Sequence, residues 1–179
     1  MKTNRLFGSE RFTIISALII SMFILSTTTL KAQNPINFSG KWLFDKAKSS
    51  PGTDQAKYDG TVIRQITQNS STIAYRDIYT QKGSNNWETS DEVFKLDGKE
   101  EIIKRDSTST DKKSTIWSKD NKSLALQYKS IYIEDGVTKE LLFCETYELS
   151  DDGKTLTIET YSKDVVRGEI KTKSVYHKK

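Results

Sequence analysis

The chain offers few side chains that could carry out catalytic chemistry. His177 is the sole histidine and lies two residues from the C-terminus, where we expect an exposed, frayed tail. A lone histidine in such a place argues against a Ser-His triad, a histidine general base and a histidine-rich zinc site. The sequence therefore predicts no catalytic residues, no metal ligands and no cofactor, and we expect the protein not to be an enzyme.

Carboxylates are the remaining route to catalysis, because a facing pair of them could hydrolyse a glycosidic bond. Glu145 is the candidate, since it shares a strand face with Phe143 and Tyr147. An acid on an apolar face is costly to bury without a partner. We favour a position at the mouth of a barrel or an ion pair with a nearby arginine. A carboxylate-based hydrolase is the weaker alternative, because the sequence identifies no second carboxylate opposite Glu145.

Two other residue types have structural explanations. Asp120, Asp151 and Asp152 could be considered as calcium ligands, but adjacent acids in a glycine turn lack the spaced oxygens of a calcium loop. Turn formation explains them better. Cys144 is the only cysteine, so no internal disulfide can form. Its apolar surroundings in the sequence favour a buried small hydrophobic residue over a reactive thiol.

The first thirty-two residues have the pattern of an export signal. Three basic residues precede an apolar run over 12–30, and Ala32 then offers a small residue before Gln33. This predicts a signal peptide over 1–32 and a mature domain over 33–179. An uncleaved membrane anchor is the weaker alternative, because serines and threonines interrupt the run.

The predicted cleavage changes what the charge implies. The full chain has a net charge of +4, but residues 1–32 contain four basic residues and one acidic residue, which leaves the mature chain at +1. This near-neutral charge gives no electrostatic support for nucleic-acid binding. Gln33, and not a cysteine, stands directly after the predicted cleavage site, so we expect no lipidation of the mature N-terminus. We predict a periplasmic or secreted protein without stable membrane insertion.

The rest of the chain has the pattern of consecutive β-hairpins. Asp-Gly occurs four times, and this pair tolerates the positive φ angles of tight hairpin turns. The clearest hairpin covers 138–162. Residues 118–126 repeat the sequence pattern of 150–158, in which a strand end, an acidic turn, a lysine and a hydroxyl residue lead into the next strand. Ten strands are predicted over 40–45, 61–68, 72–81, 87–96, 100–107, 113–119, 123–134, 137–150, 154–162 and 169–177.

Helix signals are slight. The segment 45–57 begins with a plausible cap but is interrupted by Pro51 and Gly52, so we expect a loop with at most one helical turn. It could be a lid over an open end or a solvated connector. Sequential antiparallel strands leave two edges, and closure of the sheet removes them. We therefore predict an all-β fold, an up-and-down antiparallel β-barrel of about eight to ten strands, with a two-sheet sandwich as the alternative.

Two stretches resemble bacterial exported lipocalin-like proteins of the calycin type. In that family a Gly-x-Trp motif opens the first strand, and Gly40 and Trp42 match it at the start of the predicted mature chain. Residues 146–157 look like a second signature of the same group. The resemblance implies that Trp42 closes one end of a barrel with a cavity for a small hydrophobic or amphipathic ligand. The arginine that classical lipocalins stack on this tryptophan has no clear match here.

Aromatic residues are distributed over nearly every predicted strand, and in a barrel most of them would meet inside. Arg64, Arg76 and Arg105 could each supply a charge for an acidic head group, and Arg76 is favoured because it alternates with Ala74 and Ile78. An exposed aromatic row would instead favour a surface module for glycan or protein. The predicted ligand-binding residues are Arg76, Trp87, Phe94, Trp117, Tyr128, Phe143, Glu145 and Tyr147.

Overall fold

The chain divides into two units, residues 1–33 and 34–179. The computed structural model describes residues 34–81, 83, 86–165 and 168–179. The predicted signal peptide and its cleavage site lie outside the described residues. Within the described part, no helix is long and apolar enough to cross a membrane.

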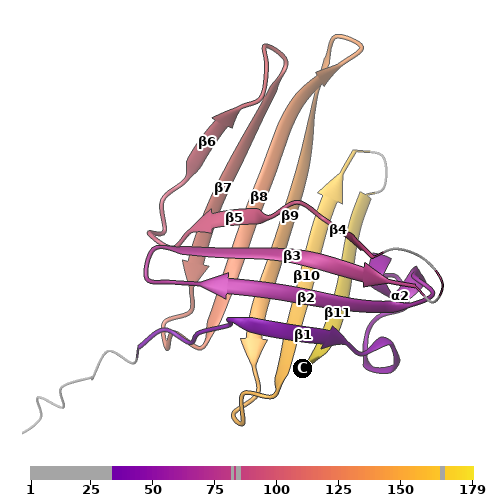
Figure 1. The fold of residues 1–179 in the computed structure, drawn as a ribbon. Helices are drawn as coiled ribbons and strands as arrows, with labels where there is room; N and C mark the ends of the chain where they lie inside the picture. The colour runs from indigo at the N-terminus through magenta and orange to yellow at the C-terminus, as the bar shows by residue number, and fades with distance from the viewer. Residues whose placement is uncertain (1–33, 82, 84–85, 166–167) are drawn as a thin grey trace, which may run out of the picture. The chain divides into compact units, whose positions relative to one another are not determined.

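Eleven strands form one antiparallel sheet in the second unit (Figure 1). The strands have the alternating burial expected of a sheet with one face turned inward, such as Val62, Arg64 and Ile66. Their bounds are β1 Gly40–Phe44, β2 Thr61–Gln68, β3 Thr72–Thr80, β4 Trp87–Glu88, β5 Glu92–Lys95, β6 Glu101–Lys104, β7 Ser109–Trp117, β8 Ser123–Glu134, β9 Val137–Leu149, β10 Thr155–Asp164 and β11 Gly168–Lys178.

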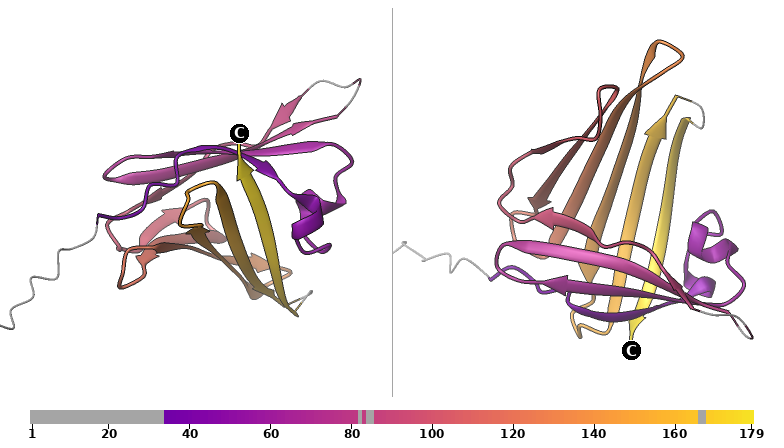
Figure 2. Two further views of the ribbon diagram at one scale, coloured as in Figure 1. Left: turned by 90° about the horizontal axis from the view of Figure 1, so that it is seen from below. Right: turned by 45° about the horizontal axis from the view of Figure 1, so that its top comes forward.

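The strand order confirms an all-β, up-and-down fold. Consecutive strands are neighbours along the path β4-β3-β2-β1-β11-β10-β9-β8-β7-β6, and β5 also pairs with β3. The first and last strands pair with each other, with Phe44 opposite Tyr176. Figure 2 shows that β1–β3 cross in front of β7–β11, so the sheet curls back over its own inner face.

The sheet has no hydrogen-bonded ladder across the gap between β5 and β7. Side chains bridge this gap instead. The hydroxyl of Thr115 donates to the Lys95 carbonyl at 2.8 Å, and the buried Lys113 ammonium pairs with Glu92 at 2.7 Å. The barrel is therefore closed on one side by β1–β11 pairing and on the other by polar side chains.

Most predicted strand positions agree with the structure. The main difference is the predicted strand over 87–96, which is two short strands, β4 and β5, that both pair with β3. Residues 89–91 between them belong to no strand. The Thr89 amide donates to the Asp77 carbonyl at 3.0 Å, but the Asp77 amide donates to the Thr89 hydroxyl at 2.9 Å. The strand breaks where a side-chain oxygen accepts one of the two bonds that a backbone pair would exchange.

Two kinds of turn connect the long strands. Asp135 and Gly136, between β8 and β9, have φ angles of 53° and 73°, as a type I′ turn requires at both central positions. In the turns of the repeated pattern, over 118–126 and 150–158, Asp120 and Asp152 each accept a hydrogen bond from a serine two residues earlier, at 2.6 Å in both turns. Each also accepts from the amide of the lysine two residues later. The repeat is confirmed as one turn structure used twice.

The apolar core fills one end of the barrel. Phe38, Trp42, Tyr147 and Tyr176 are fully buried there, together with inward residues of β2, β3, β8 and β10. The indole Nε1 of Trp42 donates to the Phe38 carbonyl at 2.9 Å. Gly40 has a φ of 150°, a conformation that residues with a Cβ rarely adopt, which gives a physical reason for glycine ahead of this tryptophan.

A cation does lie over Trp42. The Lys178 ammonium is 5.5 Å from the centre of the indole ring and comes from the last strand, β11. An ammonium within about 6 Å of an aromatic ring is attracted to its face. The cation over Trp42 is therefore a lysine of the last strand.

Residues 45–57 form a strap between β1 and β2. It contains the 3-10 helix η1 Lys46–Lys48 and the single-turn helix α2 Asp54–Lys57, which makes two short helical turns where at most one was predicted. The strap is bonded to β11, since the amides of Asp45 and Ser50 donate to the carbonyls of Val175 and Lys173 at 2.8 and 2.7 Å. It is therefore anchored to the sheet.

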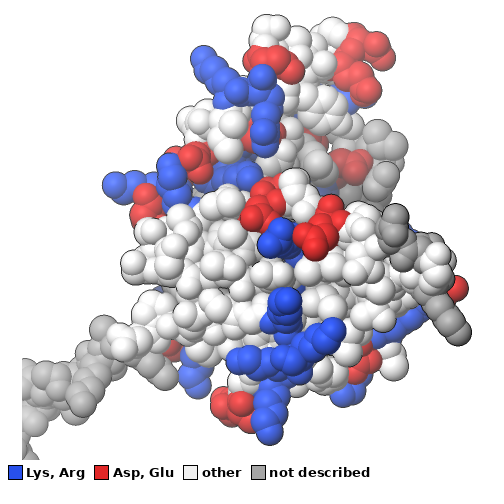
Figure 3. All heavy atoms as spheres, in the orientation of Figure 1, with Lys and Arg blue, Asp and Glu red and all other residues white. Residues whose placement is uncertain are grey.

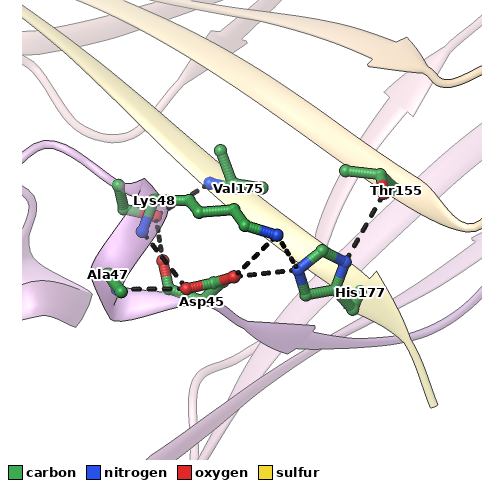
Figure 4. Close-up of polar contacts among 7 residues, drawn as sticks. Asp45, Ala47, Lys48, Thr155, Val175 and His177 are labelled. Atoms are coloured by element: carbon green, nitrogen blue, oxygen red, sulfur yellow. Dashed lines mark hydrogen bonds and ion pairs between the residues drawn. The ribbon is translucent and has the colours of Figure 1, made fainter.

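The prediction that His177 lies in a frayed tail is wrong. β11 continues to Lys178 between β1 and β10, and His177 pairs in register with Leu43 and Thr155. Its Nε2 lies 2.8 Å from Asp45 Oδ2 and its Nδ1 lies 3.4 Å from the Thr155 hydroxyl, two contacts drawn in Figure 4. The His177 side chain therefore holds Asp45, the first residue of the strap, against β11.

Charged side chains of both signs are interspersed on the face seen in Figure 3. Many of them form exposed ion pairs, including Arg76 with Glu88 at 3.1 Å and Lys129 with Glu140 at 2.8 Å. Such pairs contribute little to stability.

Candidate functional site

A cavity of about 520 Å³ lies where the apolar core ends. Along β10 the core includes Leu156 and Ile158, whereas the next inward residues, Thr160 and Ser162, line the cavity. The strap covers one side with Gly52, Thr53 and Gln55, and the segment around β4 and β5 contributes Thr89, Ser90 and Glu92. The interior therefore changes from apolar to polar along the barrel axis.

The cavity floor is a buried charge network centred on Arg64. Its Nε and Nη2 donate to the two carboxylate oxygens of Asp77 at 2.8 and 2.9 Å. Its Nη1 donates to Glu145 at 2.9 Å and to the Tyr147 hydroxyl at 3.0 Å. The Tyr147 hydroxyl in turn donates to the other Glu145 oxygen at 2.7 Å. Three strands, β2, β3 and β9, are thus joined by one guanidinium group.

The ionisation states of this network follow from burial and pairing. Burial would lower the pKa of Arg64, but the attraction of Asp77 and Glu145 outweighs it and raises that pKa well above its usual value. Burial likewise raises the pKa of Asp77, and Arg64 more than reverses this, so the Asp77 pKa is lowered. Burial raises the pKa of Tyr147 well above its usual value, which keeps its hydroxyl a donor to Glu145.

Aromatic rings enclose the guanidinium. The centre of the Arg64 guanidinium lies 4.4 Å from the Tyr75 ring centre and 5.7 Å from that of Tyr176. The Tyr176 hydroxyl is buried without a hydrogen-bond partner, the one such side-chain atom found among the described residues. The strap also reaches the network, because the Gln55 amide donates to Asp77 at 3.1 Å.

The structure places Glu145 as the sequence predicts. It is 5% exposed, it pairs with an arginine, and it lies on the inward face with Phe143 and Tyr147, opposite to Cys144. Phe143 and Glu145 line the cavity, and the fully buried Tyr147 lies beneath them in the core. Cys144 is half-buried on the outer side, and burial raises the pKa of its thiol.

The expectation that Arg76 faces the interior is wrong. In β3 the inward residues are Ile73, Tyr75, Asp77 and Tyr79, so Arg76 points outward with Ala74 and Ile78. Its side chain is 38% exposed and pairs with Glu88 and Asp91.

The remaining predicted residues lie outside the lining of the cavity. Phe94 is buried in the core, and Trp117 packs at the core edge, stacked on Phe38 at 6.2 Å. Tyr128 is half-buried, with the Lys113 ammonium 5.9 Å from its ring centre. Trp87 is 49% exposed and stacks on Tyr79 at 4.0 Å, so its expected interior position is wrong. The β4 strand carries it on the rim.

The central residues of the network are Asp77, which the sequence reasoning did not consider, and Arg64, which it considered but ranked below Arg76. Each interrupts an inward apolar series, Arg64 between Val62 and Ile66, and Asp77 between Tyr75 and Tyr79. The β2–β3 hairpin register places these two opposite charges directly across from each other. Opposite charges on the inner faces of two strands joined by a short turn were the signal that could have identified the pair.

A second hollow, of about 570 Å³, lies on the outer face of β9–β11. Tyr161, Lys171 and Glu159 are among its lining residues. None of the buried polar or charged side chains in the described ranges lines it. Within those ranges no group of three or more His, Cys, Asp and Glu residues could hold a metal ion.

Comparisons with known proteins add little. No family model matches the sequence, and no curated protein matches it. Among solved structures, the chain is similar to the zebrafish ileal bile acid-binding protein complexed with cholic acid, with 16% identity over 79% of this chain and 98% of that chain and a TM-score of 0.39.

Proposed function

We propose that the protein binds a small amphipathic molecule inside its β-barrel and is not an enzyme. The observation that carries this proposal is the open cavity of about 520 Å³ above a rigid polar floor. A concave site of this size is in the range of small-molecule pockets, and its lining combines a few apolar residues with many polar ones. Leu141, Phe143 and Ile170 supply apolar lining, and Arg64 and Glu145 supply polar groups held by their own hydrogen bonds.

The same network argues against Glu145 as a general acid or base. Arg64 binds one of its oxygens and Tyr147 the other, so both are engaged in structural hydrogen bonds. The surface glycan module has less support, because Trp87 is the one large exposed aromatic residue among the described residues, and an aromatic row is absent from that set.

We also propose that the protein acts outside the cytoplasm, either in the periplasm or as a secreted protein. The support is the export pattern of residues 1–32. A barrel released by cleavage at Ala32 would keep the strand that carries Gly40 and Trp42.

A titration with a neutral solvatochromic dye such as Nile red tests the binding function. We expect saturable fluorescence enhancement at one dye per chain, and competition by unlabelled amphiphiles. Ser162→Trp should abolish it, because the indole would fill a cavity-lining position that is only half-buried. Glu148→Gln, on the outer face of the same sheet, is the matched surface control. Linear, non-saturating fluorescence equal in wild type and Ser162→Trp would contradict the proposal.

A further inference from the structure

The charge of the cavity points to the class of ligand. Acidic side chains outnumber basic ones in its lining, which contains Asp54, Asp77, Glu92, Glu145, Asp164, Lys57 and Arg64. Glu92 pairs with Lys113 at 2.7 Å and Asp54 with Lys57 at 3.0 Å, which leaves Arg64 facing the two carboxylates Asp77 and Glu145. A concave site with this excess of negative charge attracts cations and disfavours anions. The inference rests on the proposed binding function and makes it more specific.

Arg64 is not available to an acidic ligand. Four of its five N–H groups are used by Asp77, Glu145 and Tyr147, and Tyr75 covers one face of the guanidinium. A ligand carboxylate could form a bidentate pair with Arg64 only by displacing a protein carboxylate, which would then be buried without a partner. The other basic lining residue, Lys57, is 65% exposed and already pairs with Asp54 at 3.0 Å.

An ammonium group, in contrast, would complete the network. Arg64 is opposed by two buried carboxylates, Asp77 and Glu145, whose side chains are 7% and 6% exposed. Each oxygen of Glu145 receives one hydrogen bond and can accept another. A positive charge placed against Glu145 would balance the second carboxylate in a water-poor site, where charge pairing is strong.

The walls determine what the ammonium group should be attached to. Hydroxyls of Thr160, Ser162, Thr172 and Ser174 line the β10–β11 side. Toward the mouth, Leu141, Phe143 and the 41% exposed Ile170 provide apolar surface. We propose that the cavity selects a cationic amphiphile, an amine whose ammonium group contacts Glu145 while its apolar part lies against Leu141, Phe143 and Ile170.

Three probes of equal chain length test this proposal: dodecylamine, dodecanol and dodecanoic acid, each below its micelle concentration at pH 7. Their dissociation constants are measured by calorimetry and by displacement of the neutral dye. We expect dodecylamine to bind at least about tenfold tighter than dodecanoic acid, with the neutral alcohol between them.

Glu145→Gln should remove the preference for the amine, weakening dodecylamine by about tenfold with little change for dodecanol. The variant keeps an acceptor for Arg64 and leaves the Arg64–Asp77 pair intact. Glu148→Gln removes the same charge from the outer face of β9 and should leave all three constants unchanged. If Glu145→Gln does not fold, the ranking of the three probes on the wild-type protein still decides.

The outcomes separate this inference from the proposed function. Dodecanoic acid binding as tightly as dodecylamine, or a preference that survives in Glu145→Gln, would overturn the cationic ligand and leave the binding cavity standing. Failure of all three probes and of the neutral dye to bind would overturn both.

Discussion

Arg64 joins three strands through groups that are all removed from solvent. Buried ion pairs are expensive to form, but removing one partner is costlier still, because it leaves the other charge buried and unpaired. Loss of Arg64 would leave Asp77 and Glu145 without their ion-pair partner, and their side chains are only 7% and 6% exposed. The guanidinium is therefore needed for the cavity floor to persist.

Arg64→Met should lower the free energy of unfolding by about 3–5 kcal/mol. Arg76→Met is the matched control, because Arg76 lies on the same hairpin but forms exposed ion pairs, which contribute about 1 kcal/mol or less. Urea unfolding of both variants measures the difference. Equal losses for the two variants would mean that the Arg64 network does not support the barrel.

Tyr147 and Tyr176 form a second matched pair. Both are fully buried, but the Tyr147 hydroxyl bonds Glu145 and Arg64, whereas that of Tyr176 has no partner. Tyr147→Phe should cost about 1–3 kcal/mol, while Tyr176→Phe should be neutral or stabilising. Thermal unfolding of both variants checks this. A destabilised Tyr176→Phe would show that its hydroxyl is satisfied in solution.

At the residue scale, the sequence predicted types of environment better than particular partners. Alternation with Phe143 and Tyr147 was enough to place Glu145 inward and to suggest an arginine partner, and both are confirmed. The same reasoning gave Arg76 the wrong face, because Ala74 and Ile78 are apolar but cover the outside of the sheet. Choosing between two alternating faces requires the register of β3 against β2, which local apolarity does not supply.

At the scale of elements, the strap over 45–57 depends on a histidine near the chain end. The hydrogen bond from His177 holds the pKa of Asp45 below its usual value, outweighing the opposing effect of burial. Asp45 also caps η1, since its side chain accepts from the amides of Ala47 and Lys48. One carboxylate thus fixes both the first turn of the strap and its attachment to β11.

Asp45→Asn should make stability less sensitive to acid. The pKa of Asp45 is lower in the folded protein than in the unfolded chain, where it is about 4. The charged carboxylate therefore stabilises the fold fully above that unfolded pKa, and its contribution is lost as the pH falls through the folded pKa. The variant, which retains a capping oxygen, should be less stable than wild type at pH 6 and converge with it near pH 2. Urea unfolding across this range tests the prediction, and a constant difference would contradict it.

The β8–β9 turn offers a test of local backbone geometry. Gly136 has a φ of 73° and open space around its Cα, so Gly136→Ala should cost about 1–2 kcal/mol from conformation alone. Gly52→Ala is the control, because an added Cβ would make only an ordinary contact with Thr172 at 3.7 Å. Chemical denaturation distinguishes the two, and equal effects would count against the assigned turn.

Strand positions were predictable because period-two alternation and Asp-Gly turns act locally. The break of the expected strand 87–96 was not, because it depends on the Thr89 hydroxyl meeting the backbone of Asp77, a contact with a different strand. His177 shows the same limit. A position two residues from the end of the chain suggests fraying, yet the position of His177 is set by the pairing of β11 with β1 and β10.

At the scale of the whole described unit, the barrel is asymmetric. One end is filled by Trp42 and the other buried aromatic residues, and the other holds the cavity. The all-β, up-and-down order was accessible from the sequence, because short connections favour neighbour pairing. The lateral gap was not, because closure by Thr115 and Lys113 depends on the curvature of the complete sheet.

The central claim is that the cavity is a binding site for a small molecule. Its most direct test is native mass spectrometry of the protein purified from the organism that makes it, beside Ser162→Trp expressed and purified in the same way. We predict that the wild-type protein carries one small molecule per chain, released on denaturation, and that Ser162→Trp carries none. A wild-type protein that carries no small molecule, or a molecule retained equally by wild type and Ser162→Trp, would contradict a binding site in the cavity.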